Sequence, residues 1–494
     1  MIIGDMPDLL ASRAALSRES VALEEVSTGR TLIYGDLDAR AARVAGLLAA
    51  RGIGAGDRVA ILCRQRIAFF ELLFACARLG AILVPLNWRM PPTELDGLIA
   101  DAAPALLFHD GRDAGAVAAL AARPPTIDLD GDYEGLVAAE SPHPGRAHWP
   151  ADGIWYLLYT SGTTGRPKGV IYTYRMALAN LVNIGTAIGL TARDTHAAFL
   201  PNFHTGGINL HALPTLLVGG RVLLMETFEA ETMIGLLREE RLDTLFGVPT
   251  IYQALLDHPD FAALPLGRVR HWGCGGAPLA DALAARGRAA GIRICNGMGM
   301  TETGPTAFLL DPADAWEKIG SVGKPQLLCS ARIVNTADAP VADGEVGEVQ
   351  FAGPGVTPGY WRDEAATAAA FTADGWLRSG DLARRDADGF TWIAGRRKEM
   401  FISGGENVYP VEVENVLAAC PGVIDVAVLA RPDAKWGEVG RAFVQLAPDR
   451  SPDEAELAAF CRQRLAPYKV PAAFEFVPDF PRTSAGKIRK HLLA

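Results

Sequence analysis

Residues 159–170 combine glycines, hydroxyl side chains and a lysine in a pattern that suits phosphate binding. They read YTSGTTGRPKGV and follow the apolar run IWYLL, so we expect a strand that ends in a loop. Glycines let backbone amides approach an anion, hydroxyl groups donate hydrogen bonds to it, and a lysine supplies positive charge. The spacing differs from GxxxxGK(S/T), so this is not a Walker A loop. The residues assigned to phosphate binding are Thr160, Ser161, Gly162, Thr163, Thr164, Gly165 and Lys168.

A loop of this composition is by itself often a plain turn. The complete string, however, resembles the signature loop of the adenylate-forming superfamily. That superfamily includes acyl-CoA synthetases, the adenylation domains of peptide synthetases, and luciferases. Segments that resemble its other motifs follow in the family's order over essentially the whole chain. These segments most resemble those of the acyl-CoA synthetase, or acid-thiol ligase, branch.

Two of these segments imply an acyl pocket. PNFHTGG resembles the motif that supplies an aromatic gate between the acyl pocket and a thiol tunnel, which implies this role for His204. GGAPL resembles a segment whose backbone, at Gly275, Gly276 and Ala277, lies beside adenine and the acyl group. The resemblance implies a roomy apolar slot, and hence an aromatic or hydrophobic acid rather than acetate. The positions that match the family's pocket are His204, Gly206, Gly207, Ile208, Phe246, Ala277, Gly297 and Gly299.

The segment GMTETG resembles the motif whose threonine contacts the α-phosphate and whose glutamate binds magnesium, which places these roles on Thr301 and Glu302. One glutamate suffices, because magnesium takes most of its ligands from phosphate and water oxygens. Most relatives carry a tyrosine just before Gly299 that stacks on adenine, whereas this chain has Met298. A thioether contact with a ring is less directional, so we expect modestly weaker nucleotide binding.

The last part of the chain resembles the remaining motifs. RSGDLARRDADGF resembles the ribose-binding motif, so Asp381 is expected to accept hydrogen bonds from two ribose hydroxyls. GRRKEM resembles an interdomain hinge, in which Arg396 would contact ribose or phosphate and Lys398 would occupy the pivot. The tail PRTSAGKIRK implies that Lys487 reaches the acyl carboxylate and the α-phosphate during adenylation. After a rotation at the hinge, Gly404 and Gly405 would line the thiol tunnel.

Helix and strand patterns alternate along most of the chain and must position these residues. Apolar residues recur at helical spacing over residues 36–50, the turn GIGAGD follows, and VAILC then reads as a strand. The class is α/β. We predict a large amino-terminal domain of helix-covered sheets at 1–395, with a β-rich subdomain at about 318–394. A small, mobile α+β carboxyl-terminal domain with strands and a long helix follows at 396–494, with its hinge at 396–398.

Composition excludes several other classes of protein. A chain of 494 residues exceeds what one hydrophobic core usually serves. It carries 47 basic and 57 acidic side chains, a balance opposite in sign to a nucleic-acid-binding surface, so no nucleic-acid partner is expected. Seven cysteines without paired CxxC spacing suggest neither a zinc site nor a disulfide framework. Because the amino terminus does not resemble a signal peptide and no apolar run suits a membrane span, we expect a soluble, cytoplasmic protein.

These features predict an ATP-dependent ligase that activates a carboxylic acid as its acyl adenylate and passes the acyl group to coenzyme A, with magnesium as the metal. An enzyme that loads the acyl group onto a carrier protein is an alternative, because the same adenylate chemistry precedes both transfers. A binding or regulatory protein that only keeps the nucleotide fold is disfavoured by the joint presence of Lys168, Glu302, Asp381, Arg396 and Lys487. Luciferase-like oxidation has no support beyond the shared motifs. Homodimer formation is implied by the resemblance alone.

Overall fold

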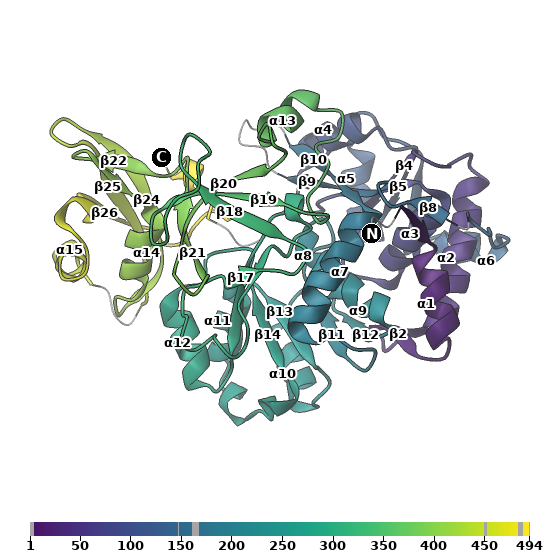
Figure 1. Cartoon of the computed structure of the whole chain (residues 1–494). Helices are drawn as coiled ribbons and strands as arrows, with labels where there is room; N and C mark the ends of the chain where they lie inside the picture. Colours follow the sequence, from purple (N-terminus) through teal and green to yellow (C-terminus); the bar gives the residue numbers. More distant parts are fainter. Residues whose placement is uncertain (1–3, 147, 161–166, 449–451, 483–487, 494) are drawn as a thin grey trace.

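The computed structural model describes residues 4–146, 148–160, 167–448, 452–482 and 488–493. A large body built on two helix-covered sheets carries a four-stranded sheet, and a small lobe with its own sheet stands at one end of the molecule (Figure 1). The predicted α/β class, with a β-rich part and a smaller carboxyl-terminal domain, is confirmed. Of the described helices, none is long and apolar enough to cross a membrane.

The first sheet has six strands in the order β10-β9-β5-β4-β6-β7, and only β10 runs antiparallel to its neighbour. Helix α2 forms because its apolar positions fall on one face, and Leu37, Val44 and Leu48 are fully buried. This confirms the helix and strand predicted from residue 36 onward. The strands are β4 (Arg58–Leu62), β5 (Ile82–Pro85), β6 (Leu106–His109), β7 (Thr126–Asp128), β9 (Ile154–Thr160) and β10 (Lys168–Thr173). The helices interleaved with them are α2 (Tyr34–Ala49), α3 (Ile67–Leu79), α4 (Pro92–Ala102), α5 (Ala114–Ala118) and α6 (Tyr133–Ala139).

The second sheet has nine strands in the order β17-β16-β15-β14-β13-β11-β12-β2-β3, and its central strands are parallel. Parallel strands bring their carboxyl ends to one edge, which is where ligands bind in such sheets. The strands are β2 (Val21–Glu25), β3 (Thr31–Ile33), β11 (Thr195–Ala198), β12 (Arg221–Leu224), β13 (Thr244–Gly247), β14 (His271–Cys274), β15 (Ile294–Met298), β16 (Phe308–Leu309) and β17 (Lys324–Pro325). The helices are α7 (Tyr174–Ile188), α8 (Thr205–Asn209), α9 (Ala212–Val218), α10 (Ala230–Arg238), α11 (Pro249–Asp257) and α12 (Asp281–Ala289).

A four-stranded antiparallel sheet follows in the order β18-β19-β20-β21. Its elements are β18 (Ser330–Val334), β19 (Gly347–Ala352), α13 (Glu364–Ala370), β20 (Leu377–Arg385) and β21 (Thr391–Arg396). These strands lie in the part of the chain, about 318–394, that the sequence assigned to a β-rich subdomain, and β21 continues to Arg396.

The small lobe has its own hydrophobic core, which includes Phe401, Val413, Leu417 and Leu457. The prediction of a long helix in this domain was wrong, because α15 has only nine residues. The amides of Arg464 and Leu465 both donate hydrogen bonds to the carbonyl oxygen of Cys461, and the helix does not continue beyond this turn. The elements of the lobe are β22 (Phe401–Ser403), β23 (Glu406–Val408), α14 (Pro410–Ala418), β24 (Val423–Asp433), β25 (Gly437–Leu446), α15 (Glu454–Arg462) and β26 (Ala473–Phe476).

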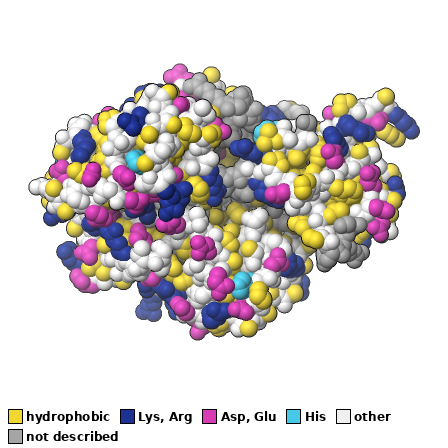
Figure 2. All heavy atoms as spheres, turned by 180° about the vertical axis from the view of Figure 1, so that it is seen from behind, with side chains coloured by type: hydrophobic (Ala, Val, Ile, Leu, Met, Phe, Trp, Pro, Cys, Tyr) yellow, Lys and Arg dark blue, Asp and Glu magenta, His cyan; other side chains and the backbone are white. Residues whose placement is uncertain are grey.

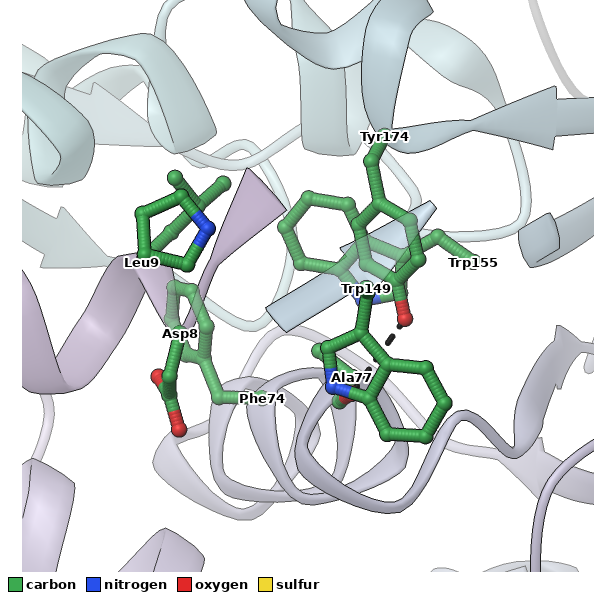
Figure 3. A pocket seen from close by; sticks show the side chains of 8 residues that line it. Asp8, Leu9, Phe74, Ala77, Trp149, Trp155 and Tyr174 are labelled. Atoms are coloured by element: carbon green, nitrogen blue, oxygen red, sulfur yellow. Dashed lines mark hydrogen bonds between the residues drawn. The ribbon is translucent and has the colours of Figure 1, made fainter. Parts of the chain in front are cut away.

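A small apolar cavity lies beneath the start of the chain, where β1 (Asp5–Pro7) pairs with β8 (His148–Pro150) and α1 (Leu9–Ser17) begins. Figure 3 shows the side chains around it, with Trp155 beside Tyr174 and the Tyr174 hydroxyl donating a hydrogen bond to the carbonyl oxygen of Ala77 at 3.3 Å. None of the residues assigned to chemistry lines this cavity. We therefore interpret it as a packing gap.

Candidate active site

The predicted phosphate loop connects two antiparallel strands. Thr160 ends β9 and Lys168 begins β10, and these two residues are register partners. The Thr160 hydroxyl donates to the carbonyl oxygen of Lys168 at 3.5 Å, so the two ends of the loop lie side by side. The predicted loop residues between them, Ser161, Gly162, Thr163, Thr164 and Gly165, lie outside the described residues.

The side chain of Tyr360 joins Lys168 to Glu302. The ammonium nitrogen of Lys168 lies 4.9 Å from the centre of the Tyr360 ring, and the Tyr360 hydroxyl donates a hydrogen bond to Oε1 of Glu302 at 3.0 Å. Tyr360 is held in place because its segment pairs with β10, where the amide of Trp361 donates to the carbonyl of Gly169 at 2.7 Å. The sequence did not reveal Tyr360, because a lone aromatic after a Pro-Gly pair carries no sign of contacts with such distant positions.

Glu302 is a buried carboxylate at the carboxyl edge of the nine-stranded sheet. It belongs to a short helical turn, Thr301–Thr303, that follows β15, and only 6% of the residue is exposed. Burial raises the pKa of its carboxyl, while the Tyr360 hydrogen bond and the positive charges of Arg396 and Lys168 act in the opposite direction. A carboxylate in this setting suits a divalent cation, because the cation offsets the cost of burying the charge.

The surroundings of Glu302 also bear on which metal fits. Within the described part of the chain, no group of three or more His, Cys, Asp or Glu side chains is arranged to hold a metal ion. A zinc-like site of several protein ligands is therefore not formed there. Magnesium fits one carboxylate, since it takes its other ligands from phosphate and water.

Asp381 and Arg396 form an ion pair on neighbouring strands. They are register partners on β20 and β21, and Nε of Arg396 lies 2.6 Å from Oδ1 of Asp381. The carboxylate is buried while the guanidinium is about half exposed. Buried Glu348 contacts the neighbours of both residues. Its Oε1 accepts from the amide of Gly380, beside Asp381, at 3.0 Å, and its Oε2 lies 3.0 Å from Arg397, beside Arg396. Asp381, predicted to contact the ribose, and Arg396, predicted to contact the ribose or a phosphate, thus lie together.

Glycines at the ends of β14 and β15 let two backbones approach closely. A Cβ atom at Gly299 would lie 1.4 Å from the carbonyl oxygen of Pro305, and one at Gly275 would lie 3.0 Å from that of Gly297. Gly276 has a φ of +80°, which favours glycine. Ala277 follows in the same loop after β14. Met298 ends β15 and is half-buried against the cluster that contains Ala307 and Phe308.

Only some of the residues matched to the acyl pocket gather between the nine-stranded sheet and α8. His204 immediately precedes this helix, and its ring lies 4.7 Å from that of Phe203. A narrow crevice is lined by Gly206, Gly207 and Phe246 together with His196, Leu200 and Leu210. Ile208 instead lies wholly inside the hydrophobic core, and the space beside Gly297 is taken by the carbonyl oxygen of Phe308.

The chain passes from the four-stranded sheet to the small lobe through one tight turn. β21 ends at Arg396, whose carbonyl accepts from the amides of Glu399 and Met400, and β22 begins at Phe401. Lys398 is exposed in this turn. Gly404 and Gly405, with φ of +61° and +89°, form the turn between β22 and β23.

Two further contacts of the small lobe involve Gly404 and Lys490. A Cβ atom on Gly404 would lie 2.7 Å from the indole of Trp436, a residue that sequence reasoning missed. Lys487 lies outside the described residues. Nearby in sequence, the Lys490 ammonium lies 2.6 Å from Glu399 and 2.8 Å from Glu414.

The arrangement suits a nucleoside triphosphate, because a buried carboxylate at the carboxyl edge of a parallel sheet accepts from Tyr360, and the ammonium of Lys168 lies against the ring of that tyrosine. The fold, a large domain of helix-covered sheets with a smaller carboxyl-terminal domain, places such a site where parallel sheets bind ligands. Two family profiles match the chain: "AMP-binding enzyme" over residues 10–361 and "AMP-binding enzyme C-terminal domain" over residues 412–487. The chain belongs to the AMP-binding enzyme family, as the resemblance predicted.

Individual relatives are similar over nearly their full length. The feruloyl-CoA synthase of an Amycolatopsis species is 42% identical over 97% of this chain and 96% of its own. The fatty acid–[acyl-carrier-protein] ligase ScoC of Streptomyces coeruleorubidus is 34% identical over 94% of this chain and 91% of its own. The o-succinylbenzoate CoA synthetase of Bacillus subtilis, solved with its acyl-adenylate intermediate, has a TM-score of 0.89 and 31% identity and covers 99% of this chain and 98% of its own.

Proposed function

We propose that the protein is an ATP-dependent carboxylic acid–CoA ligase that works through an acyl adenylate. The observation that carries the proposal is the link from Lys168 through Tyr360 to buried Glu302, in a chain similar over nearly its whole length to ligases of this kind. Most side chains that line the narrow crevice are apolar, which favours an aromatic or hydrophobic acid and agrees with the name of the feruloyl-CoA synthase.

In the first step, a carboxylate oxygen of the acid attacks the α-phosphorus of ATP. A bond forms between these atoms, the bond to the bridging oxygen breaks, and pyrophosphate leaves. Lys168 and Arg396 stabilise the negative charge on the phosphate oxygens, and Thr301 lies beside Glu302 to contact the α-phosphate. Magnesium held by Glu302 would offset further charge when it is bound. Lys487 binds the acyl carboxylate in this step.

In the second step, the thiol sulfur of coenzyme A attacks the acyl carbonyl carbon, and AMP leaves with the electrons of the broken C–O bond. The thiol proton passes to solvent. The small domain, residues 396–494, turns at 396–398 for this step, so that Lys487 withdraws and Gly404 and Gly405 line the thiol path. The tight turn between β21 and β22 suits such a pivot, and exposed Trp436 beside Gly404 offers a flat surface for the approaching cofactor.

The nucleotide part of the proposal rests on the ion pair of Asp381 and Arg396. Asp381 accepts from the ribose hydroxyls, and Met298 contacts adenine in place of the usual tyrosine. The reducing cytoplasm is the proposed location, because none of the seven cysteines, all of them among the described residues, forms a disulfide, and six of them are buried.

The test is an acid panel assayed with ATP, magnesium and coenzyme A. We expect pyrophosphate, AMP and acyl-CoA to form in equal amounts with aromatic or hydrophobic acids and far less with acetate. Replacing Glu302 with Gln removes the carboxylate, whereas Glu317→Gln changes a carboxylate outside the candidate site and serves as the control. If no acid in a broad panel released pyrophosphate, the proposal would fall.

A carrier protein is the second candidate for the acceptor, because one relative carries the name of an acyl-carrier-protein ligase. Parallel assays with coenzyme A and with a phosphopantetheinylated carrier would separate the two. Acyl transfer to the carrier at a rate above that to coenzyme A would favour the alternative.

A further inference from the structure

Buried histidines lie behind the crevice assigned to the acyl group. In the nine-stranded sheet, His196 of β11 pairs in register with Thr244 of β13, which pairs with His271 of β14. Register partners in a sheet point to the same face, so the side chains of this row share one face. Phe246 and Gly273 form the next row on that face, toward the carboxyl ends of the strands and the nucleotide-binding segments.

A third histidine faces this row from the helix layer. His211 lies immediately before α9, and its ring centre lies 5.0 Å from that of His196, 5.5 Å from that of His271 and 5.6 Å from that of Phe246. Each of the three histidines is only 2% exposed. His196, His211 and His271 are called the histidine cluster below, and His196 lines the crevice directly.

The histidine cluster has unused hydrogen-bonding capacity. Nδ1 of His211 and both ring nitrogens of His271 have no hydrogen-bond partner among the residues that the structure describes. Leaving such groups unpaired destabilises a folded protein, so natural cores rarely contain them without a partner. Burial lowers the pKa of His196 to about 4 and that of His271 to about 3. The rings are therefore neutral at neutral pH, and a neutral ring carries one donor and one acceptor. At His196 one ring nitrogen, Nδ1, already pairs with the carbonyl oxygen of Thr244 at 3.3 Å, whereas at His271 both nitrogens are available.

We propose that the histidine cluster binds a hydroxyl group at the far end of an aromatic acyl substrate. This inference rests on the proposed function, because it places the acid in the crevice with its carboxylate toward the nucleotide. A hydroxyl matches the cluster, since it donates one hydrogen bond and accepts another. A second carboxylate matches less well, because Arg270, the cation that acts on His211 and His271, is already paired with Asp194 at 2.7 Å.

The glycine surface beneath Phe246, a side chain that lines the crevice, suits a flat ring. Gly273 and Gly275 have no side chains, and the ring of Phe246 lies against them, because Cβ atoms there would lie 2.8 Å and 3.3 Å from it. One planar ring thus already rests on this glycine surface. If the Phe246 side chain turns aside, a substrate ring takes the same place, and its distal substituent points to His271 and His211.

The experiment compares matched acids: 4-hydroxycinnamate, cinnamate, 4-methylcinnamate and 4-carboxycinnamate. We measure kcat/KM for acyl-CoA formation with the intact protein. A site that hydrogen-bonds a hydroxyl rejects analogues that lack it, so we expect 4-hydroxycinnamate to exceed 4-methylcinnamate by about tenfold to a hundredfold. In His271→Leu this ratio should fall toward one, and in His271→Asn, which keeps hydrogen-bonding groups, part of it should return. His148→Leu, at an exposed position on β8, should keep the parent ratio.

The outcomes separate this inference from the proposed function. Conversion of all four acids with equal kcat/KM would overturn the inference and leave the ligase assignment standing. A preference for 4-carboxycinnamate would also overturn it, in favour of a dicarboxylic acid. Absence of acyl-CoA with every acid of a broad panel would overturn both. The comparison of acids on the parent protein decides the question even if the Leu variant does not fold.

Discussion

The buried state of His271 predicts how stability depends on pH. The ordinary pKa of histidine is 6.5, and burial lowers that of His271 to about 3, with the positive charge of Arg270 acting in the same direction. The unfolded chain therefore binds a proton below about pH 6.5 that the folded chain does not bind. The contribution of His271 to stability is fully present above that pH and is lost as the pH falls toward 3.

The size of the effect follows from linkage. Each pH unit in this interval changes the free energy of unfolding by about 1.4 kcal/mol for one proton, so lowering the pH to about 5 costs about 2 kcal/mol at His271. His196 and His211 face the same space and add their own losses, and Arg270 remains charged and paired with Asp194. Replacing His271 with Gln removes only the contribution of His271 to this pH dependence of the free energy of unfolding.

The assay is urea unfolding, followed by tryptophan fluorescence, at several pH values between about 7.5 and 5. Between these limits the parent should lose about 2 kcal/mol more than His271→Gln, whatever the variant's stability at neutral pH. His148→Gln, at the exposed position, should follow the parent. Equal losses in the parent and in His271→Gln would show that His271 is protonated in the folded protein, and the reasoning would be refuted.

Three further predictions concern the reaction. Lys487→Ala should abolish adenylation yet spare thioester formation from synthetic acyl adenylate, and equal loss of both steps would contradict the proposed division between them. Met298→Tyr should tighten ATP binding in a calorimetric titration, and unchanged affinity would argue against an adenine contact at this position. Tyr360→Phe removes a hydrogen bond to a carboxylate, so kcat/KM for ATP should fall by about tenfold or more, and full activity would show that the bond to Glu302 is dispensable.

Local patterns in the sequence were enough to predict elements whose character is local. The spacing of Leu37, Val44 and Leu48 indicated α2, and the turn residues after it indicated where β4 begins. The family and the ligase class were also predicted, because motif strings carry them, and the comparisons confirm both. The roles assigned to individual site residues stay predictions, although the structure links Lys168 to Glu302 through Tyr360 and pairs Arg396 with Asp381.

Features that depend on the register of distant strands could not be predicted. Tyr360 meets Glu302 only because its segment pairs with β10. His196 and His271 become neighbours through Thr244, and no periodicity in the sequence reveals which residues of parallel strands stand side by side. The length of α15 was misjudged for a related reason, since a helical pattern does not show where backbone amides will close the last turn.

The apolar surface of the small lobe has a consequence for its contacts. Large hydrophobic side chains are exposed there at Ile402, Ile424, Trp436 and Phe476, and Figure 2 shows hydrophobic side chains on the outer face of the lobe. A surface of this kind suits a transient contact that forms and breaks during a cycle. We expect a swing of the lobe to change which of these side chains water reaches, so hydrogen exchange at β22 and β25 would report it.

The ion pair of Asp381 and Arg396 has a consequence for timing. Asp381 is proposed to accept hydrogen bonds from the sugar hydroxyls of the nucleotide, and the same carboxylate pairs with Arg396. Arg396 is two residues from the proposed pivot, Lys398. Occupation of the sugar site then weakens a restraint next to the joint. Arrival of the nucleotide and loosening of the joint would then be a single event, so the lobe would gain its freedom to swing only when a nucleotide is bound.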